Sequence, residues 1–196
     1  RDSKKDMSQF EAQKGVNVLY KKNETNDIFT LIYVFNTGTE NDPALNLAFD
    51  YLSYLGTDKM SAEQIASEMY AIACSFGLSA GANQSWIEVS GLSENMGKAM
   101  EIVEGLIAGA QPNEEILQNL KGDMIKSRAD AKLNQSRCFG ALQRYMIYGS
   151  DFIRRPTLTD PALQGLTSEQ LLAKIGDLMG KQHEVLYYCL LYTSPS

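Results

Sequence analysis

The sequence is poor in the side chains that build metal sites and disulfides. It contains one histidine, His183, and three cysteines, Cys74, Cys138 and Cys189, among 196 residues. One distant histidine excludes a Ser-His-Asp triad, and no spacing of acidic residues predicts a one-histidine metal site, so a surface or strand-edge histidine is expected. The cysteines have no CxxC spacing. Cys74 and Cys138 lie in helical patterns and are predicted to be buried free thiols.

Long apolar runs and an excess of positive charge are also missing. Even the stretch "IFTLIYVFNTG" stops at Asn36, well short of the roughly 18 to 20 apolar residues that cross a bilayer, so no membrane span is expected. The formal net charge is -6 and the basic residues are scattered, which argues against nucleic acid as a partner. With 44% hydrophobic residues, the composition is that of one globular domain with a buried core.

The two ends of the chain are set apart from this domain. Residues 1–14 form a polar lead-in without an initiator methionine or the apolar stretch of a signal peptide, so the native start is expected upstream. Residues 189–196, "CLLYTSPS", resemble one reading frame of a common sequencing adapter and are predicted not to be native. Residues 15–188 are therefore expected to form a single domain.

Apolar residues at every second position predict strands in four places. Val16, Val18 and Tyr20 alternate with polar neighbours, and "DIFTLIYVFNTG" is rich in β-branched and aromatic residues. Two short runs within residues 76–93 surround Asn83-Gln84-Ser85 and predict an antiparallel hairpin. The run "HEVLYY" predicts a last strand.

Apolar residues at helical spacing, with capping residues before them, predict the helices. Pairs of Ser or Thr with Gln three residues later, as at Ser61 and Thr167, are capping boxes. The predicted helices cover residues 41–56, 61–77, 93–110, 112–128, 136–148 and 166–179. Gly77 is expected to end the second of them. Residues 149–165, which contain two prolines, are the expected hinge-like segment.

The order of these elements predicts the fold class. Pairs of strands are followed by pairs of helices, rather than alternating one by one. This order favours an α+β two-layer sandwich with a largely antiparallel sheet and helices packed on one face.

From about Val16 to Tyr188 the chain resembles a domain of the pitrilysin and insulin-degrading-enzyme family of zinc peptidases, the inverzincins. The residues that carry the resemblance are "DIFTLIYVF", the helix that closes on "YLSYLGT", "SAEQIASEMYAIACSFG" with the following "LSAGANQSWIEVSGLSENMGKAMEIVEGLI", and "LQNLKGDMIKSRAD". The resemblance implies a sandwich of the LuxS/MPP-like type.

Catalytic members of this family carry HxxEH on the helix that ends in a similar Gly-Thr, and a later helix supplies a third, acidic zinc ligand. When Gly56 and Thr57 are aligned with that Gly-Thr, the resemblance places the two histidine positions on Leu47 and Tyr51. It places the general base on Asp50. It places the third ligand at or beside Arg128. Leucine, tyrosine and arginine do not replace imidazole and carboxylate ligands, so neither a catalytic nor a metal site is expected here. Asp50 is expected to be a solvated or helix-facing acid, paired with Arg128.

The resemblance therefore implies a non-catalytic domain, the first of the C-terminal half of a zinc metalloendopeptidase. Such a domain would form part of the chamber wall around a peptide and pack against the catalytic half, on the same or a companion polypeptide. Zinc is expected in that catalytic half and no cofactor in this chain, which should be inactive alone. The alternative is a separately encoded, non-catalytic partner or scaffold subunit that binds peptides. Bacterial relatives are often exported, so the resemblance points towards the periplasm.

Overall fold

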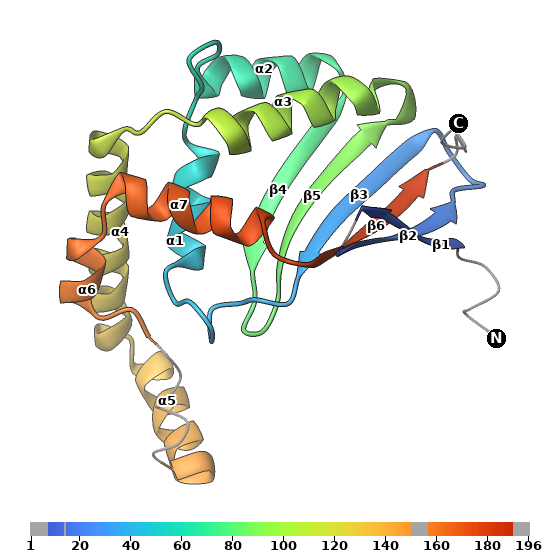
Figure 1. The fold of residues 1–196 in the computed structure, drawn as a ribbon. Helices are drawn as coiled ribbons and strands as arrows, with labels where there is room; N and C mark the ends of the chain where they lie inside the picture. Colours follow the sequence, from blue (N-terminus) through green and yellow to red (C-terminus); the bar gives the residue numbers. More distant parts are fainter. Residues whose placement is uncertain (1–7, 14, 150–156, 190–196) are drawn as a thin grey trace.

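The computed structural model describes residues 8–13, 15–149 and 157–189 (Figure 1). Its centre is one six-stranded sheet with the strand order β1-β2-β6-β3-β5-β4. The strands are β1 (Ser8–Gln13), β2 (Val16–Lys22), β3 (Ile28–Phe35), β4 (Cys74–Ala80), β5 (Ser85–Leu92) and β6 (His183–Cys189). Neighbouring strands are antiparallel except β2 and β6, which are parallel.

Helices cover one face of this sheet (Figure 1). They are α1 (Leu45–Ser53), α2 (Ala62–Ala71), the short 3-10 helix η2 (Ser93–Asn95), α3 (Met96–Gly109), α4 (Glu114–Leu133), α5 (Gln135–Tyr148), α6 (Asp160–Gly165) and α7 (Ser168–Met179). The two-layer α+β sandwich with a largely antiparallel sheet is thus confirmed. Both predicted capping boxes form, at Ser61 with Gln64 and at Thr167 with Gln170.

Alternation along the strands decides which side chains meet the helices. Phe29 and Phe35 of β3, and Ile87 and Val89 of β5, are fully buried in the main core. The alternate residues of each strand point to the opposite face of the sheet. That second face is only half-buried and carries apolar side chains such as Ile32 and Val34, with Trp86 exposed.

The boundary between α2 and β4 differs from the prediction. The helix ends at Ala71, and Gly77 lies inside β4 instead of ending the helix. Ala73 adopts a left-handed φ of 51° that turns the chain into the strand. Gly91 of β5 permits this turn, because a Cβ there would lie 2.4 Å from Cys74 Sγ. Pairing of β4 with β5 therefore overrides the helical pattern of residues 72–77.

The cysteines are free, as predicted, but only partly in the predicted places. Cys74 is buried at the start of β4, whereas Cys138 is exposed on α5. The predicted burial of Cys138 is wrong because α5 projects away from the sheet and the other helices (Figure 1). Cys189, the first residue of the segment predicted to be non-native, is the last residue of β6 and is buried. Residues 190–196 lie outside the described residues.

The expected hinge-like segment is partly helical. Residues 160–165 form α6, with Thr159 as its N-cap and a proline in its first turn. Leu163 of α6 is fully buried in the main core. Residues 150–156 lie outside the described residues. No helix of the described residues combines the length and apolar character needed to cross a bilayer.

Candidate functional site

Helix α1 lies where catalytic relatives are expected to carry zinc ligands, and its inward face is closed by packing. Leu47 and Tyr51 share that face, one turn apart, and have 1% and 0% of their surface exposed. Leu47 packs in the main core with its neighbours Ala48 and Leu52. A metal-bound water needs an open position, and these two buried side chains leave none on this face.

The Tyr51 hydroxyl is bound into a chain of hydrogen bonds between three helices. It accepts from the backbone N–H of Asn113, the N-cap of α4, at 2.8 Å. It donates to Ser168 Oγ of α7 at 2.9 Å, and Ser168 in turn donates to Glu114 Oε2 at 3.0 Å. Hydrogen bonds from Gln118 and Ser168 lower the pKa of the Glu114 carboxyl. At the second histidine position, the chain therefore has a phenol that ties α1 to α4 and α7.

Asp50 lies beside these residues on α1 but points to solvent. Partial burial raises the pKa of its carboxyl group. Its carboxylate has no hydrogen-bond or ion-pair partner among the described residues.

Arg128 does not pair with Asp50. Its Nη1 contacts Asp160 Oδ1 of α6 at 2.5 Å, with both side chains partly exposed. The expected pairing of Asp50 with Arg128 is therefore wrong. Residues 157–166 lie over α4 and supply the partner, a long-range arrangement that the spacing between α1 and α4 does not reveal.

A residue of α4 that sequence reasoning missed has a clear structural role. Lys121 is 3% exposed, and its Nζ donates to the backbone oxygens of Gln164 at 3.1 Å and Leu166 at 2.6 Å. The signal was present in the sequence. Lys121 follows the fully buried Leu117 by four residues, so it lies on the apolar stripe of the helix.

His183 is not at the surface or at a sheet edge. It begins β6, which lies between β2 and β3, and only 9% of its surface is exposed. Its ring packs against those of Tyr33 and Phe35, with centroid distances of 5.9 and 5.0 Å. Alternating apolar residues in β6 predicted a strand, but not that the strand lies inside the sheet.

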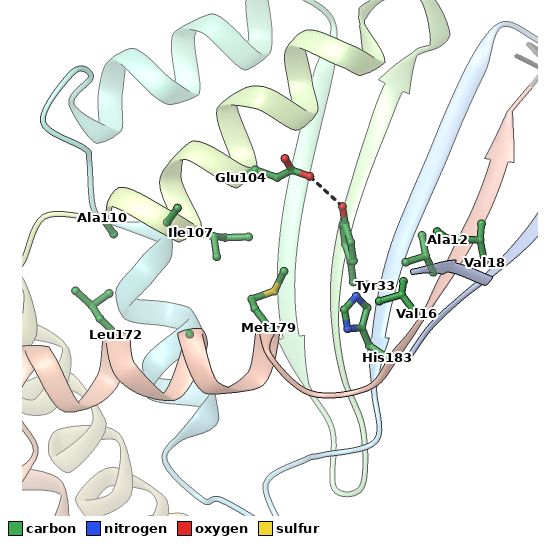
Figure 2. A pocket seen from close by; sticks show the side chains of 13 residues that line it. Ala12, Val16, Val18, Tyr33, Glu104, Ile107, Ala110, Leu172, Met179 and His183 are labelled. Carbon is green, nitrogen blue, oxygen red and sulfur yellow. Dashed lines mark hydrogen bonds between the residues drawn. The ribbon is translucent and has the colours of Figure 1, made fainter. Parts of the chain in front are cut away.

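No metal-binding cluster accompanies this histidine. Within the part of the chain that the structure describes, His, Cys, Asp and Glu side chains nowhere form a group of three or more that could hold a metal ion. His183 instead borders a cavity of about 710 Å³ between the sheet and helices α3 and α7 (Figure 2). The sequence does not reveal this cavity, because its walls come from six elements that include both ends of the described chain.

Comparisons with known proteins identify the fold. No protein-family model matches the sequence, and no curated protein matches it. Solved structures do match. The periplasmic protease PqqL from Escherichia coli has a TM-score of 0.79 at 15% identity, covering 95% of this chain and 21% of that one. A peptidase M16 inactive domain from Pseudomonas fluorescens has a TM-score of 0.77 at 17% identity, covering 95% and 47%.

A third match is the ferredoxin protease FusC, solved in complex with Arabidopsis ferredoxin, with a TM-score of 0.80 at 11% identity. This chain spans about a fifth of the two protease chains, 21% and 22%, and about half of the inactive-domain chain, 47%. At these identities the likeness establishes the fold, and it confirms the expected pitrilysin-type resemblance at that level. The chain has the fold of the M16 peptidase domains, among them one described as inactive.

Proposed function

We propose that this chain is a non-catalytic domain of a pitrilysin-type zinc metalloendopeptidase. In this role it packs against the catalytic half and forms part of the wall around an enclosed peptide. Helix α1 is the observation that carries the proposal. The fold matches that of M16 peptidase domains, yet Leu47 and Tyr51 fill the expected zinc face with buried packing and hydrogen bonds.

Exposed apolar surfaces support a role within a larger assembly. On α5, Phe139, Leu142 and Met146 recur at helical spacing and are 61%, 54% and 77% exposed. This helix projects from the body of the domain (Figure 1), and clustered apolar side chains on a projecting helix are typical of an interaction surface. The matched structures are about two to five times longer than this chain, as the 21% to 47% coverage shows. We assign α5 to the contact with the catalytic half.

A separately encoded partner subunit is the second candidate. It is favoured by the likeness to a chain described as an inactive domain, of which this chain covers 47%. The reading frame upstream of Arg1 separates the two candidates. An HxxEH motif in that frame makes this chain part of one polypeptide enzyme, and a start codon immediately before Arg1 supports the separate subunit.

Reconstitution tests the proposal in either case. The chain is mixed with the HxxEH-bearing half from the same genome, and cleavage of a quenched fluorescent peptide is followed. We expect no cleavage by this chain alone, a stable complex with the catalytic half, and zinc-dependent cleavage by the complex. Zinc-dependent cleavage by this chain alone would contradict the proposal, as would a catalytic half that forms no complex and is equally active without this chain.

A pair of α5 variants tests the assigned surface. Phe139→Ser with Met146→Ser removes apolar area from the projecting face and should weaken the complex. Gln143→Ser, on the same exposed helix, changes no apolar contact and should leave the complex intact. Equal binding of the catalytic half by both variants would show that the interface lies elsewhere on the domain.

A further inference from the structure

The hydrophobic core is divided at the edge of the helical layer. Val16, Val18 and Val185 form a small cluster that is separate from the main core. They lie on β2 and β6, beyond the strands that α3 and α7 cover (Figure 1). The cavity of about 710 Å³ occupies the boundary between the two groups. Its volume lies in the range of about 300 to 1,000 Å³ that is typical of ligand pockets.

The walls of this cavity are mainly aliphatic. Figure 2 shows Val16 and Val18 on the sheet side, facing Met179 and Leu172 of α7 and Ile107 of α3 across the space. Such walls favour an apolar group that is removed from water on binding.

The polar groups that line the cavity offer acceptors and a negative charge. Tyr33 Oη donates to Glu104 Oε1 at 3.3 Å across it (Figure 2). His183 Nδ1 lies 2.8 Å from the Lys181 carbonyl oxygen. A carbonyl only accepts, so Nδ1 carries a proton, and in the neutral imidazole Nε2 is left as an acceptor. Of the residues that the structure describes, Glu104 is the one acidic residue that lines the cavity.

We propose that this cavity binds an apolar side chain of an extended peptide that carries a basic residue next to it. The apolar side chain enters between the valines of the sheet and helix α7, and the cationic group lies against the Glu104 carboxylate at the rim. The net charge of -6 on the chain attracts the same peptides at longer range. This inference rests on the proposed role in enclosing a peptide and names the class of peptide that is held.

Gly176 provides a way to fill the cavity without disturbing the core. It lines the cavity from α7, and a Cβ added there meets no atom within 4 Å. Glycine is also a poor residue inside a helix, so Gly176→Leu should fold at least as well as the wild type. Gly122 of α4 is a matched control. It is an exposed helical glycine with the same free space, and it does not line the cavity.

Methyl NMR of methionine gives a residue-specific test. Met179 lines the cavity, and its methyl signal in the methyl-¹³C-labelled chain is assigned with Met179→Leu. The probe is a Gly/Ser peptide that carries Phe-Arg pairs, compared with the same peptide carrying Phe-Glu pairs. We expect the Phe-Arg peptide to shift the Met179 signal saturably and the Phe-Glu peptide to bind more weakly.

The variants complete the test. Gly176→Leu, followed through the other methionine signals and by fluorescence anisotropy of the labelled peptide, should lose binding, while Gly122→Leu keeps it. Glu104→Gln should weaken binding of the Phe-Arg peptide about two- to fivefold, as expected for a partly exposed ion pair.

Two results would overturn the inference and leave the proposed function standing: peptide binding that Gly176→Leu does not change, or peptide binding that leaves Met179 unaffected. A shift of Met179 by free phenethylamine but not by the peptide would overturn the peptide as the occupant. Failure of the proposed function is seen separately, in the reconstitution with the catalytic half.

Discussion

At the scale of single residues, Tyr51 explains how an expected zinc position becomes a structural one. A histidine there would present a nitrogen to a metal. The tyrosine instead extends to the N-terminus of α4 and to Ser168 of α7. Its hydroxyl satisfies the Asn113 N–H, which no bond within α4 can satisfy. Removing this hydroxyl should therefore lower the stability of the folded domain.

Tyr51→Phe keeps the ring packing and removes only the hydrogen bonds. The Asn113 N–H loses its acceptor, so we expect the free energy of unfolding to fall by about 1 to 2 kcal/mol. Tyr54→Phe is the control, because Tyr54 is 57% exposed at the end of the same helix, and it should change little. Urea unfolding measures both. Equal stabilities for the two variants would show that the Tyr51 hydroxyl does not connect the helices.

Tyr33 gives a prediction for the dependence on pH. Burial, together with the nearby Glu104 carboxylate and its hydrogen bond, raises the pKa of Tyr33 to about 12. The folded state thus holds this proton more tightly than the unfolded state, whose tyrosine pKa is about 10. The protonated Tyr33 hydroxyl therefore contributes fully to the free energy of unfolding below pH 10. This contribution is lost as the pH rises through about 12.

Absorbance of tyrosinate, with Tyr33→Phe to identify the signal, measures this titration. In Glu104→Gln the pKa of Tyr33 should fall, because the charge is removed, but stay above 10, because burial remains the largest cause. A wild-type Tyr33 that titrates near pH 10 would contradict the burial of its hydroxyl beside Glu104.

At the scale of elements, α4 is held to the segment that precedes α7 by one buried lysine. The Lys121 ammonium satisfies the carbonyl oxygens of Gln164 and Leu166 at the end of α6. Arg128 adds a second contact about two turns later, to Asp160. These contacts fix α6 and the start of α7 relative to α4, and so help to place Ser168 against Tyr51.

Lys121→Met retains most of the buried stem and removes the charged donor. We expect a loss of about 1 to 3 kcal/mol in the free energy of unfolding, because two carbonyl oxygens lose a charged partner. Lys98→Met, which breaks the exposed Lys98–Glu68 pair, should cost less than about 1 kcal/mol. Thermal and urea unfolding compare the two. A Lys121→Met chain as stable as the wild type would contradict the structural role of Lys121.

The sequence predicts the boundary of a helix or strand where the residues next to that boundary determine it. Caps at Ser61, Asn113 and Thr167 are local, and all three helices start there. The end of α2 is not local, because pairing with β5 draws residues 74–77 into a strand. The exposure of Cys138 likewise depends on how α5 projects, which its amphipathic pattern does not specify.

At the scale of the whole molecule, alternation and element order predict the two-layer sandwich, because burial of one sheet face under helices follows from them. They do not predict that β6 lies between β2 and β3, so the burial of His183 is missed. The cavity is missed for the same reason, since Tyr33 and Glu104 are 71 residues apart. The replaced ligand positions Leu47 and Tyr51 could be named from the resemblance, but the hydrogen bonds of Tyr51 could not.

The domain also leaves surfaces that a single copy does not bury. The apolar side chains of α5 and the second face of the sheet are open to solvent or only half-buried. This exposure supports the proposal that the domain works within a larger assembly.

Zinc binding by the isolated chain tests the central claim most directly. The chain is dialysed against zinc and its bound metal is measured by mass spectrometry, with Leu47→Ala and His183→Ala as reference variants. The account predicts no saturable zinc above background for the wild type and no change in either variant. Stoichiometric zinc that is lost in His183→Ala, or that supports peptide cleavage by the chain alone, would contradict it.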